Sequence, residues 1–364
     1  MQRERAEQAV AAERSPAPGR RKSPEQIRRG VAHIPYGASP AGLRTGVESR
    51  EVIVFKFGGT SLAGAERLRH AAQLVRHAAE KAAVAVVASA MKGVTDQLLR
   101  LDRLRQGGEF ARAARAAREA ETLLQLHLDV LGELRLPREE QERVEHDIQL
   151  LGRDLLHEVA RSGGGEAERA DRLASFGERF SVRLFAAALE ATGVRAVPVA
   201  SSDFVLTCDT FRDARPQLRE TRRRGRELLL PLLDAGVVPV VTGFIGATAD
   251  GRITTLGRNS SDYSGALVAH VVDADELVIW TDVDGIYTEN PSEVAEAKLL
   301  HELSYAEAHA LAEGGAKVLH PRMLPLAAET QMTVWVRNTF RPELNGTRIG
   351  PPASGAAEHT GGVA

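Results

Sequence analysis

A lysine followed by two glycines and two hydroxyl residues, at positions 56–61, is the segment of this chain best suited to bind an anion. It follows the apolar run 52–55, which is typical of a strand, and precedes the helical pattern 62–80. The glycines let the backbone approach a ligand, and Thr60 and Ser61 could cap the helix, whose N-terminus favours negative charge. The segment therefore predicts a phosphate-binding loop with a mobile lysine, although a tight turn with an exposed lysine shows the same pattern.

Five further segments carry small or charged residues at strand ends or helix starts, where α/β sheets bind their ligands. They are residues 89–96, 176–179, 254–264, 280–288 and 314–321. Within them, Asp262 stands at an expected helix start and Lys317 is a second lysine beside flexible backbone. Taken singly, Asp262 could be a helix cap, and Glu178 with Arg179 could be an ordinary ion pair at a helix start.

The alternation of short β-branched runs with longer helical patterns predicts an α/β fold, with a mainly parallel sheet covered by helices on both faces. The expected strands are residues 52–55, 83–88, 196–199, 237–242, 276–281 and 333–336. Residues 97–162 lack strand signals, and their apolar positions recur every three or four residues. We expect a helical insertion there, which packs on the domain as a hairpin or helps to form a dimer.

Composition limits the classes of partner. The net charge of -2 gives no overall field that would attract nucleic acid or an anionic membrane. The single cysteine, Cys208, rules out an internal disulfide and fits the reducing cytoplasm, and no run of about 18 apolar residues predicts a membrane span. Residues 1–50 and 351–364 have the composition of disordered ends.

Four strings occur together and in family order: residues 56–61, 257–263, 280–288 and 315–321. On these strings the chain resembles the amino acid kinase family from about residue 52 to residue 350, and aspartokinases in particular. The sequences of residues 336–339 and 346–350 most resemble the kinase portion of bifunctional aspartokinase-homoserine dehydrogenases.

The resemblance implies a three-layer αβα sandwich with a kinase domain over residues 51–350. A substrate-binding lobe would span about 51–235 and a nucleotide-binding lobe about 236–350. The implied activity is aspartate kinase: MgATP phosphorylates the side-chain carboxylate of L-aspartate, giving 4-phospho-L-aspartate and ADP, the first step toward lysine, threonine and methionine. A cytoplasmic homodimer that pairs through the kinase domain is expected.

The resemblance also assigns residues. Lys56, Asp262 and Lys317 would be catalytic, with the aspartate orienting both lysines. The substrate pocket would comprise Thr60, Ser89, Ala90, Thr95, Glu178, Phe244, Arg258 and Ser261, where Arg258 grips the α-carboxylate and Glu178 pairs with the α-ammonium group. Lys56, Gly58, Gly59, Thr281, Asp282, Tyr287 and Lys317 would hold the nucleotide. No protein metal site is assigned, because Mg²⁺ would be held mainly by the ATP phosphates.

A physical argument agrees with this reaction. A carboxylate nucleophile is already ionised at neutral pH, so no general base is required. The difficulty is to bring two anions together, which calls for positive charge and backbone amides around the transferring phosphoryl group. Two lysines, a glycine loop and Mg²⁺ would supply that charge.

The chain departs from the aspartokinase pattern in two places. Asn290 and Ser292 stand where an aspartate and an ATP-contacting arginine are common, which predicts weaker nucleotide binding. The sequence also contains no ACT domain, so we expect no feedback inhibition by lysine or threonine. Alternative functions are a kinase for an aspartate-like acid in a specialised pathway, or a weakly active subunit that works with an ACT-bearing partner.

Overall fold

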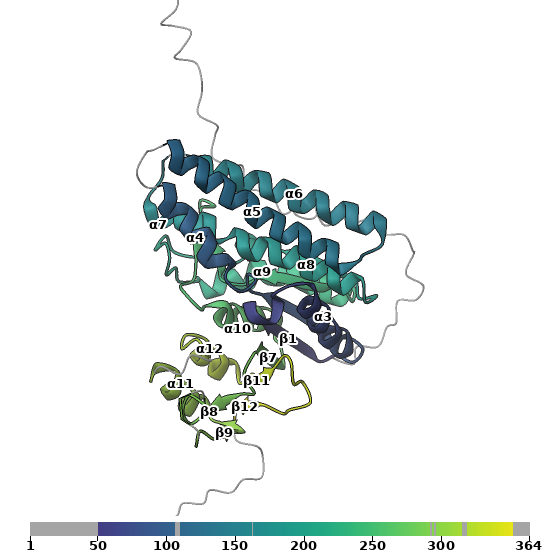
Figure 1. Ribbon diagram of the computed structural model, residues 1–364. Helices are drawn as coiled ribbons and strands as arrows, with labels where there is room; N and C mark the ends of the chain where they lie inside the picture. Colours follow the sequence, from purple (N-terminus) through teal and green to yellow (C-terminus); the bar gives the residue numbers. More distant parts are fainter. Residues whose placement is uncertain are drawn as a thin grey trace, which may run out of the picture. The chain divides into compact units, whose positions relative to one another are not determined.

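The computed structural model describes residues 50–105, 110–161, 163–291, 293–294, 296–314 and 319–351 (Figure 1). The two predicted disordered ends lie almost entirely outside these ranges, as do Ser292 and Lys317. Within them, strands and helices alternate along the chain, and each of the six predicted strands is present.

The elements have the following bounds. The strands are β1 (Val52–Phe57), β2 (Ala83–Ala88), β3 (Ala196–Val199), β4 (Val238–Thr242), β5 (Ile245–Ala247), β6 (Ile253–Thr255), β7 (Glu276–Thr281), β8 (Ile286–Tyr287), β9 (Leu299–Leu300), β10 (Glu302–Leu303), β11 (Thr333–Asn338) and β12 (Thr347–Ile349). The helices are η1 (Gly59–Leu62), α3 (Ala65–Ala79), α4 (Val94–Arg105), α5 (Phe110–Leu134), α6 (Arg138–Ala160), α7 (Glu166–Ala174), α8 (Phe176–Glu190), η2 (Ser201–Asp203), α9 (Leu218–Asp234), α10 (Ser261–Val272), α11 (Tyr305–Glu313) and α12 (Met323–Thr330).

The main sheet of the described residues has eight strands in the order β10-β12-β11-β7-β1-β2-β4-β3. The run from β11 to β3 is parallel throughout, and β12 is antiparallel to β11. This confirms the predicted mainly parallel sheet. The central strands are rich in valine and isoleucine because both of their faces are covered.

Strand register brings the loops of the predicted site to one edge of the sheet. Phe57, near the end of β1, lies opposite Ala88 of β2 and Trp280 of β7. Ala88 in turn lies opposite Thr242, and Trp280 lies opposite Arg337. Because these strands are parallel, the loops that follow them emerge side by side at the carboxyl edge.

Helices form layers on both faces of the sheet, as the αβα prediction requires. α3 and α8 contact each other on one face, and α9 and α10 contact each other on the opposite face. Figure 1 shows α5 and α6 side by side as a further layer that contacts α3 and α8. The predicted apolar stripe of α6, from Val144 to Leu155, is buried in this layer.

Successive side chains along β1 point to opposite faces of the sheet. Phe55 and Phe57 belong to the hydrophobic core that includes α3 and α8, where Phe57 stacks on Trp280 with ring centroids 6.2 Å apart. Lys56 therefore points to the opposite face, toward α10.

β4, which follows the predicted lobe boundary at residue 235, lies between β2 and β3 in the sheet. Among the described helices, none has both the length and the apolar character needed to cross a bilayer.

Candidate active site

Lys56 and Asp262 form a buried ion pair at the carboxyl edge of the sheet. The Lys56 Nζ atom lies 2.7 Å from Asp262 Oδ1, and each side chain is about 10% exposed. Asp262 is the second residue of α10, and Gly265 in the next turn leaves room for the lysine stem, since a Cβ there would lie 3.3 Å from Lys56 Cβ. The structure thus confirms the predicted placement of the carboxylate at the helix start, and it shows that Lys56 is buried and paired.

A second polar group lies at the start of α10. The hydroxyl of Ser260, just before α10, is buried and has no hydrogen-bond partner among the described residues. This hydroxyl remains available to a bound group at the helix N-terminus.

The glycine loop is held close to two neighbouring strands. The Gly58 amide donates to the carbonyl of Trp280 (3.2 Å), and the amide of Lys92 donates to the carbonyl of Gly59 (3.0 Å). A Cβ on Gly59 would lie 2.6 Å from the carbonyl oxygen of Ala90, so only glycine fits there. The sequence therefore identified correctly a loop that needs close backbone approach.

The expectation that Thr60 and Ser61 cap a helix is wrong. η1 begins directly at Gly59 and α3 begins after Gly64, and neither helix has a side-chain cap. The Ser61 hydroxyl is instead fully buried and lies 2.6 Å from that of Thr339. The Ser61 hydroxyl therefore makes a tertiary contact instead of a local capping hydrogen bond.

Among the described residues, the buried carboxylate of Glu178 has no cationic partner. It lies in the first turn of α8, where its Oε1 accepts from the Ala90 amide (3.1 Å), and its Oε2 has no partner in the part of the chain that the structure describes. Burial raises the pKa of Glu178 to about 8, against a smaller lowering by the Ala90 amide. The alternative of an ion pair with Arg179 does not hold, because Arg179 pairs with Asp154. Glu178 is therefore suited to receive a ligand cation.

Arg258 lies in the loop before α10, and its side chain is exposed. Its NH2 atom lies 2.8 Å from Asp96 Oδ1, and the two side chains are 79% and 71% exposed. Asp96 is in the first turn of α4, which follows the loop whose Ala90 amide contacts Glu178. Glu178 thus contacts the loop before α4 and Arg258 contacts the first turn of α4, where Thr95 is partly buried.

The remaining predicted pocket positions meet where β2, β4 and α10 converge. Gly243 donates to the Ala88 carbonyl, and a Cβ on Gly243 would lie 3.2 Å from Ser261 Oγ. The Phe244 amide donates to the Ser264 hydroxyl (2.7 Å), with Phe244 in the left-handed region at φ 65°, which is uncommon for a bulky residue. Ser89, directly after β2, is partly buried at the same edge.

The predicted nucleotide positions follow β7. Thr281 is its last residue, and its hydroxyl contacts the exposed Asp282 at 3.4 Å. Tyr287 lies further along and donates to Asp284, which also accepts from Asn338. Thr281 and Asp282 thus follow Trp280, whose carbonyl accepts from the glycine loop, whereas Tyr287 contacts Asp284 further along.

The second predicted lysine, Lys317, and the rest of residues 315–318 lie outside the described residues. His320, just beyond them, stacks on Tyr263 with ring centroids 5.9 Å apart. Burial lowers the pKa of His320, partly offset by Asp262. In the described part of the chain, no group of three or more histidine, cysteine or carboxylate side chains could hold a metal ion.

The sequence did not identify every residue that supports the site. Gly265 and Ser264 of α10 contact Lys56 and Phe244, and Thr339 contacts the glycine loop. Thr339 had one available signal, since a polar residue directly after a buried strand faces the ligand edge of such a sheet.

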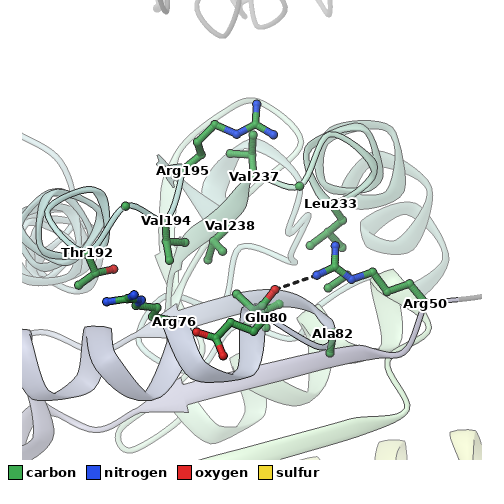
Figure 2. A pocket seen from close by; sticks show the side chains of 15 residues that line it. Arg50, Arg76, Glu80, Ala82, Thr192, Val194, Arg195, Leu233, Val237 and Val238 are labelled. Atoms are coloured by element: carbon green, nitrogen blue, oxygen red, sulfur yellow. Dashed lines mark hydrogen bonds between the residues drawn. The ribbon is translucent and has the colours of Figure 1, made fainter. Parts of the chain in front are cut away.

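A hollow of about 490 Å³ lies at the opposite edge of the sheet (Figure 2). Its lining includes the exposed Arg50, Arg76 and Arg195, around the starts of β2, β3 and β4, and Arg50 donates to the carbonyl of Ala79. Because the glycine loop and the Lys56–Asp262 pair lie where the strands end, this hollow is separate from the candidate active site.

Comparisons with known proteins agree with this geometry. Residues 51–338 match the sequence model described as the Amino acid kinase family. Lysine-sensitive aspartokinase 3 of Escherichia coli is 36% identical over 302 residues, which make up 82% of this chain and 64% of the relative. The bifunctional aspartokinase/homoserine dehydrogenase 2 of Arabidopsis thaliana is 30% identical over 306 residues, or 82% of this chain and 32% of that protein.

A solved structure is also similar to this chain. The crystal structure of E. coli aspartokinase III in complex with aspartate and ADP superimposes with a TM-score of 0.71 at 35% identity, covering 82% of this chain and 64% of that chain. The chain therefore spans somewhat less than two thirds of the E. coli relative.

Proposed function

Because this chain belongs to the amino acid kinase family, we propose that it is an aspartate kinase. In this proposal the γ-phosphoryl group of ATP is transferred to the side-chain carboxylate of L-aspartate, which yields 4-phospho-L-aspartate and ADP. The E. coli neighbour crystallised with aspartate and ADP supports this choice of substrates.

The observation that carries the proposal is the Lys56–Asp262 pair beside the glycine loop. The ammonium is buried and 2.7 Å from its carboxylate, and a Cβ on Gly58 would lie 3.7 Å from the same nitrogen. A buried positive charge fixed beside a glycine loop is an arrangement that can stabilise a transferring phosphoryl group. Asp262 holds the lysine in place, so the charge is oriented before substrate binds.

The transfer itself requires little covalent chemistry from the protein. A side-chain carboxylate oxygen of aspartate attacks the γ-phosphorus, and the bond from that phosphorus to the β,γ-bridging oxygen breaks as ADP leaves with the electron pair. No proton moves, because the nucleophile is already ionised. The task of the site is therefore to align two anions and screen their repulsion.

Glu178 and Arg258 would select an amino acid. The unpaired Oε2 of Glu178 can accept from an α-ammonium group, and the fork of Arg258 matches an α-carboxylate. Glu178 contacts the Ala90 amide in the loop after β2, and Arg258 contacts Asp96 at the start of α4, which follows that loop. This arrangement would leave the substrate side chain to point toward Lys56.

Magnesium fits the site as a partner of the nucleotide. The Asp262 carboxylate, which is paired with Lys56, could also accept from metal-bound water, while the phosphates would supply direct ligands. When bound, Mg²⁺ would neutralise phosphate charge. Lys317 belongs to the same proposal as the cation on the nucleotide side, together with Thr281, Asp282 and Tyr287.

A hydroxamate assay on the purified chain tests the function. With ATP and Mg²⁺, L-aspartate should give acyl phosphate that hydroxylamine traps, whereas glutamate and other close analogues should react at least tenfold more slowly. A faster reaction with an aspartate analogue would reassign the substrate. Absence of trapped product with every acid tested would refute the kinase proposal.

Three further features belong to the proposal. A cytoplasmic location is supported by the single cysteine. A homodimer through the kinase domain predicts a mass of twice 39.3 kDa in light scattering. The division into two lobes near residue 235 predicts closure around the substrates, which small-angle scattering with and without ligands would detect.

A further inference from the structure

We infer that Thr339 is a positioning residue, which ties the glycine loop to the strand end expected to hold the nucleotide. The inference rests on the proposed phosphoryl transfer, and it concerns a residue that the sequence did not assign to the site. Thr339 directly follows β11 and is fully buried.

Each polar group of Thr339 contacts a different element. Its hydroxyl lies 2.6 Å from that of Ser61 in η1, and its amide donates to the carbonyl of Thr281 at the end of β7 (2.8 Å). Its carbonyl accepts from Nε2 of His70 in α3 at 2.5 Å, so this nitrogen carries the proton. One residue thus joins the glycine loop, the helix behind it and the strand end beside it.

The next residue makes a parallel connection. The ring of Phe340 stacks on His70 with centroids 6.5 Å apart, and the Arg67 guanidinium lies 4.8 Å from the Phe340 centroid. Arg67 in turn donates to the carbonyl of Thr60 at 2.5 Å. The Thr60 carbonyl and the Ser61 hydroxyl are therefore both linked to the segment 339–340.

The glycine loop needs such support because it has little of its own. η1 is four residues long and has no side-chain cap, and the other anchors of the loop are backbone bonds of Gly58 and Gly59. Phosphoryl transfer depends on amides and charge being held within fractions of an ångström of their working positions. A buried hydroxyl pair provides this rigidity, since neither oxygen can exchange its partner for water.

The position of Thr281 makes the connection functional. Thr281 belongs to the proposed nucleotide site, whereas Ser61 adjoins the loop expected to contact the γ-phosphoryl group. Through Thr339 the two halves of the ATP site become one unit. Loss of the hydroxyl contact should therefore disturb recognition of the γ-phosphate more than recognition of ADP or aspartate.

The test compares Thr339→Val, which keeps shape and backbone bonds but removes the hydroxyl, with Thr339→Ser, which keeps the hydroxyl. Thr339→Val should lower kcat at least tenfold and weaken calorimetric binding of a non-hydrolysable ATP analogue at least fivefold. Affinity for ADP and the KM for aspartate should stay within twofold. Thr339→Ser should remain within threefold of the parent chain in all four quantities.

Ser61→Ala removes the same contact from its other end and serves if Thr339→Val fails to fold. Its losses should match those of Thr339→Val, and the double variant should be no worse than either single variant. The inference would be overturned if the variants bound ADP and the ATP analogue with equally weakened affinity. It would also be overturned if the losses of the two single variants were additive, or if folded variants bound the analogue as tightly as the parent chain. The nucleotide-binding measurements test this inference independently of the proposed function, because binding can be measured even if the parent chain phosphorylates no acid.

Discussion

The ammonium group of Lys56 and the carboxylate of Asp262 meet at 2.7 Å and join the central strand β1 to the start of α10. Breaking such a buried pair on one side leaves an uncompensated charge, which costs about 3–5 kcal/mol. The pair therefore contributes both to folding and to the charge that faces the glycine loop.

Lys56→Met should lower kcat by about two to three orders of magnitude, the usual cost of losing one preorganised group that stabilises transition-state charge. Asp262→Asn should also lower kcat and should reduce the urea midpoint, because the ammonium stays buried without its partner. The double variant Lys56→Met/Asp262→Asn should recover part of that stability but no activity. Near-parental turnover by Asp262→Asn would contradict the role given to this pair.

Aspartate binding should release a proton through Glu178. Burial raises the pKa of Glu178 to about 8 in the free protein, so this carboxyl is mostly protonated at pH 7, and a substrate ammonium group would favour its ionised form. The KM for aspartate should fall as pH rises from 6 to 8 and level off above 8. Calorimetry at pH 7 in buffers of different ionisation enthalpy should show nearly one proton released.

Glu178→Gln is the matched control for that proton. It should bind aspartate at least tenfold more weakly, with no proton release and no slope of KM against pH between 6 and 8. If the enthalpy of aspartate binding to the parent protein did not depend on the buffer, Glu178 would not contact the ammonium group of the substrate.

Asp96 should compete with the substrate for Arg258. Both side chains are more than 70% exposed, and an ion pair of this kind contributes about 0–1 kcal/mol. Asp96→Asn should therefore lower the KM for aspartate by up to about fivefold at low ionic strength, with kcat unchanged and a smaller effect at high salt. A higher KM in Asp96→Asn would mean that Asp96 orients Arg258 rather than competing for it.

His127 should make the protein sensitive to acid. This residue of α5 is fully buried against Phe180, with ring centroids 4.4 Å apart, and burial lowers the pKa of His127 to about 4. The unfolded chain binds this proton near pH 6.5 and the folded chain only near pH 4, so stability is complete above pH 6.5 and decreases as pH falls toward 4. The loss is on the order of 3 kcal/mol.

His127→Leu should remove that part of the acid dependence, which urea unfolding at pH 7 and at pH 4.5 would measure. The difference in unfolding free energy between the two pH values should shrink relative to the parent. An unchanged difference would assign the acid sensitivity to other groups.

The sequence by itself determined the elements and most of the site segments. Valine-rich runs can only be buried strands when helical patterns alternate with them, so β1, β2 and β7 were predictable, and with them the edge where their loops gather. Gly59 was predictable as a position of close approach, because that property belongs to the residue type.

Only the tertiary structure decided which side chains meet. Ser61 has the right type to cap a helix, yet it is bound to Thr339, 278 residues further along the chain. The pKa of Glu178 depends on the burial of this side chain, which is not visible in local sequence. Patterns along a chain report the periodicity of burial, whereas contact and desolvation depend on distances that exist only after the strands have paired and the helices have packed.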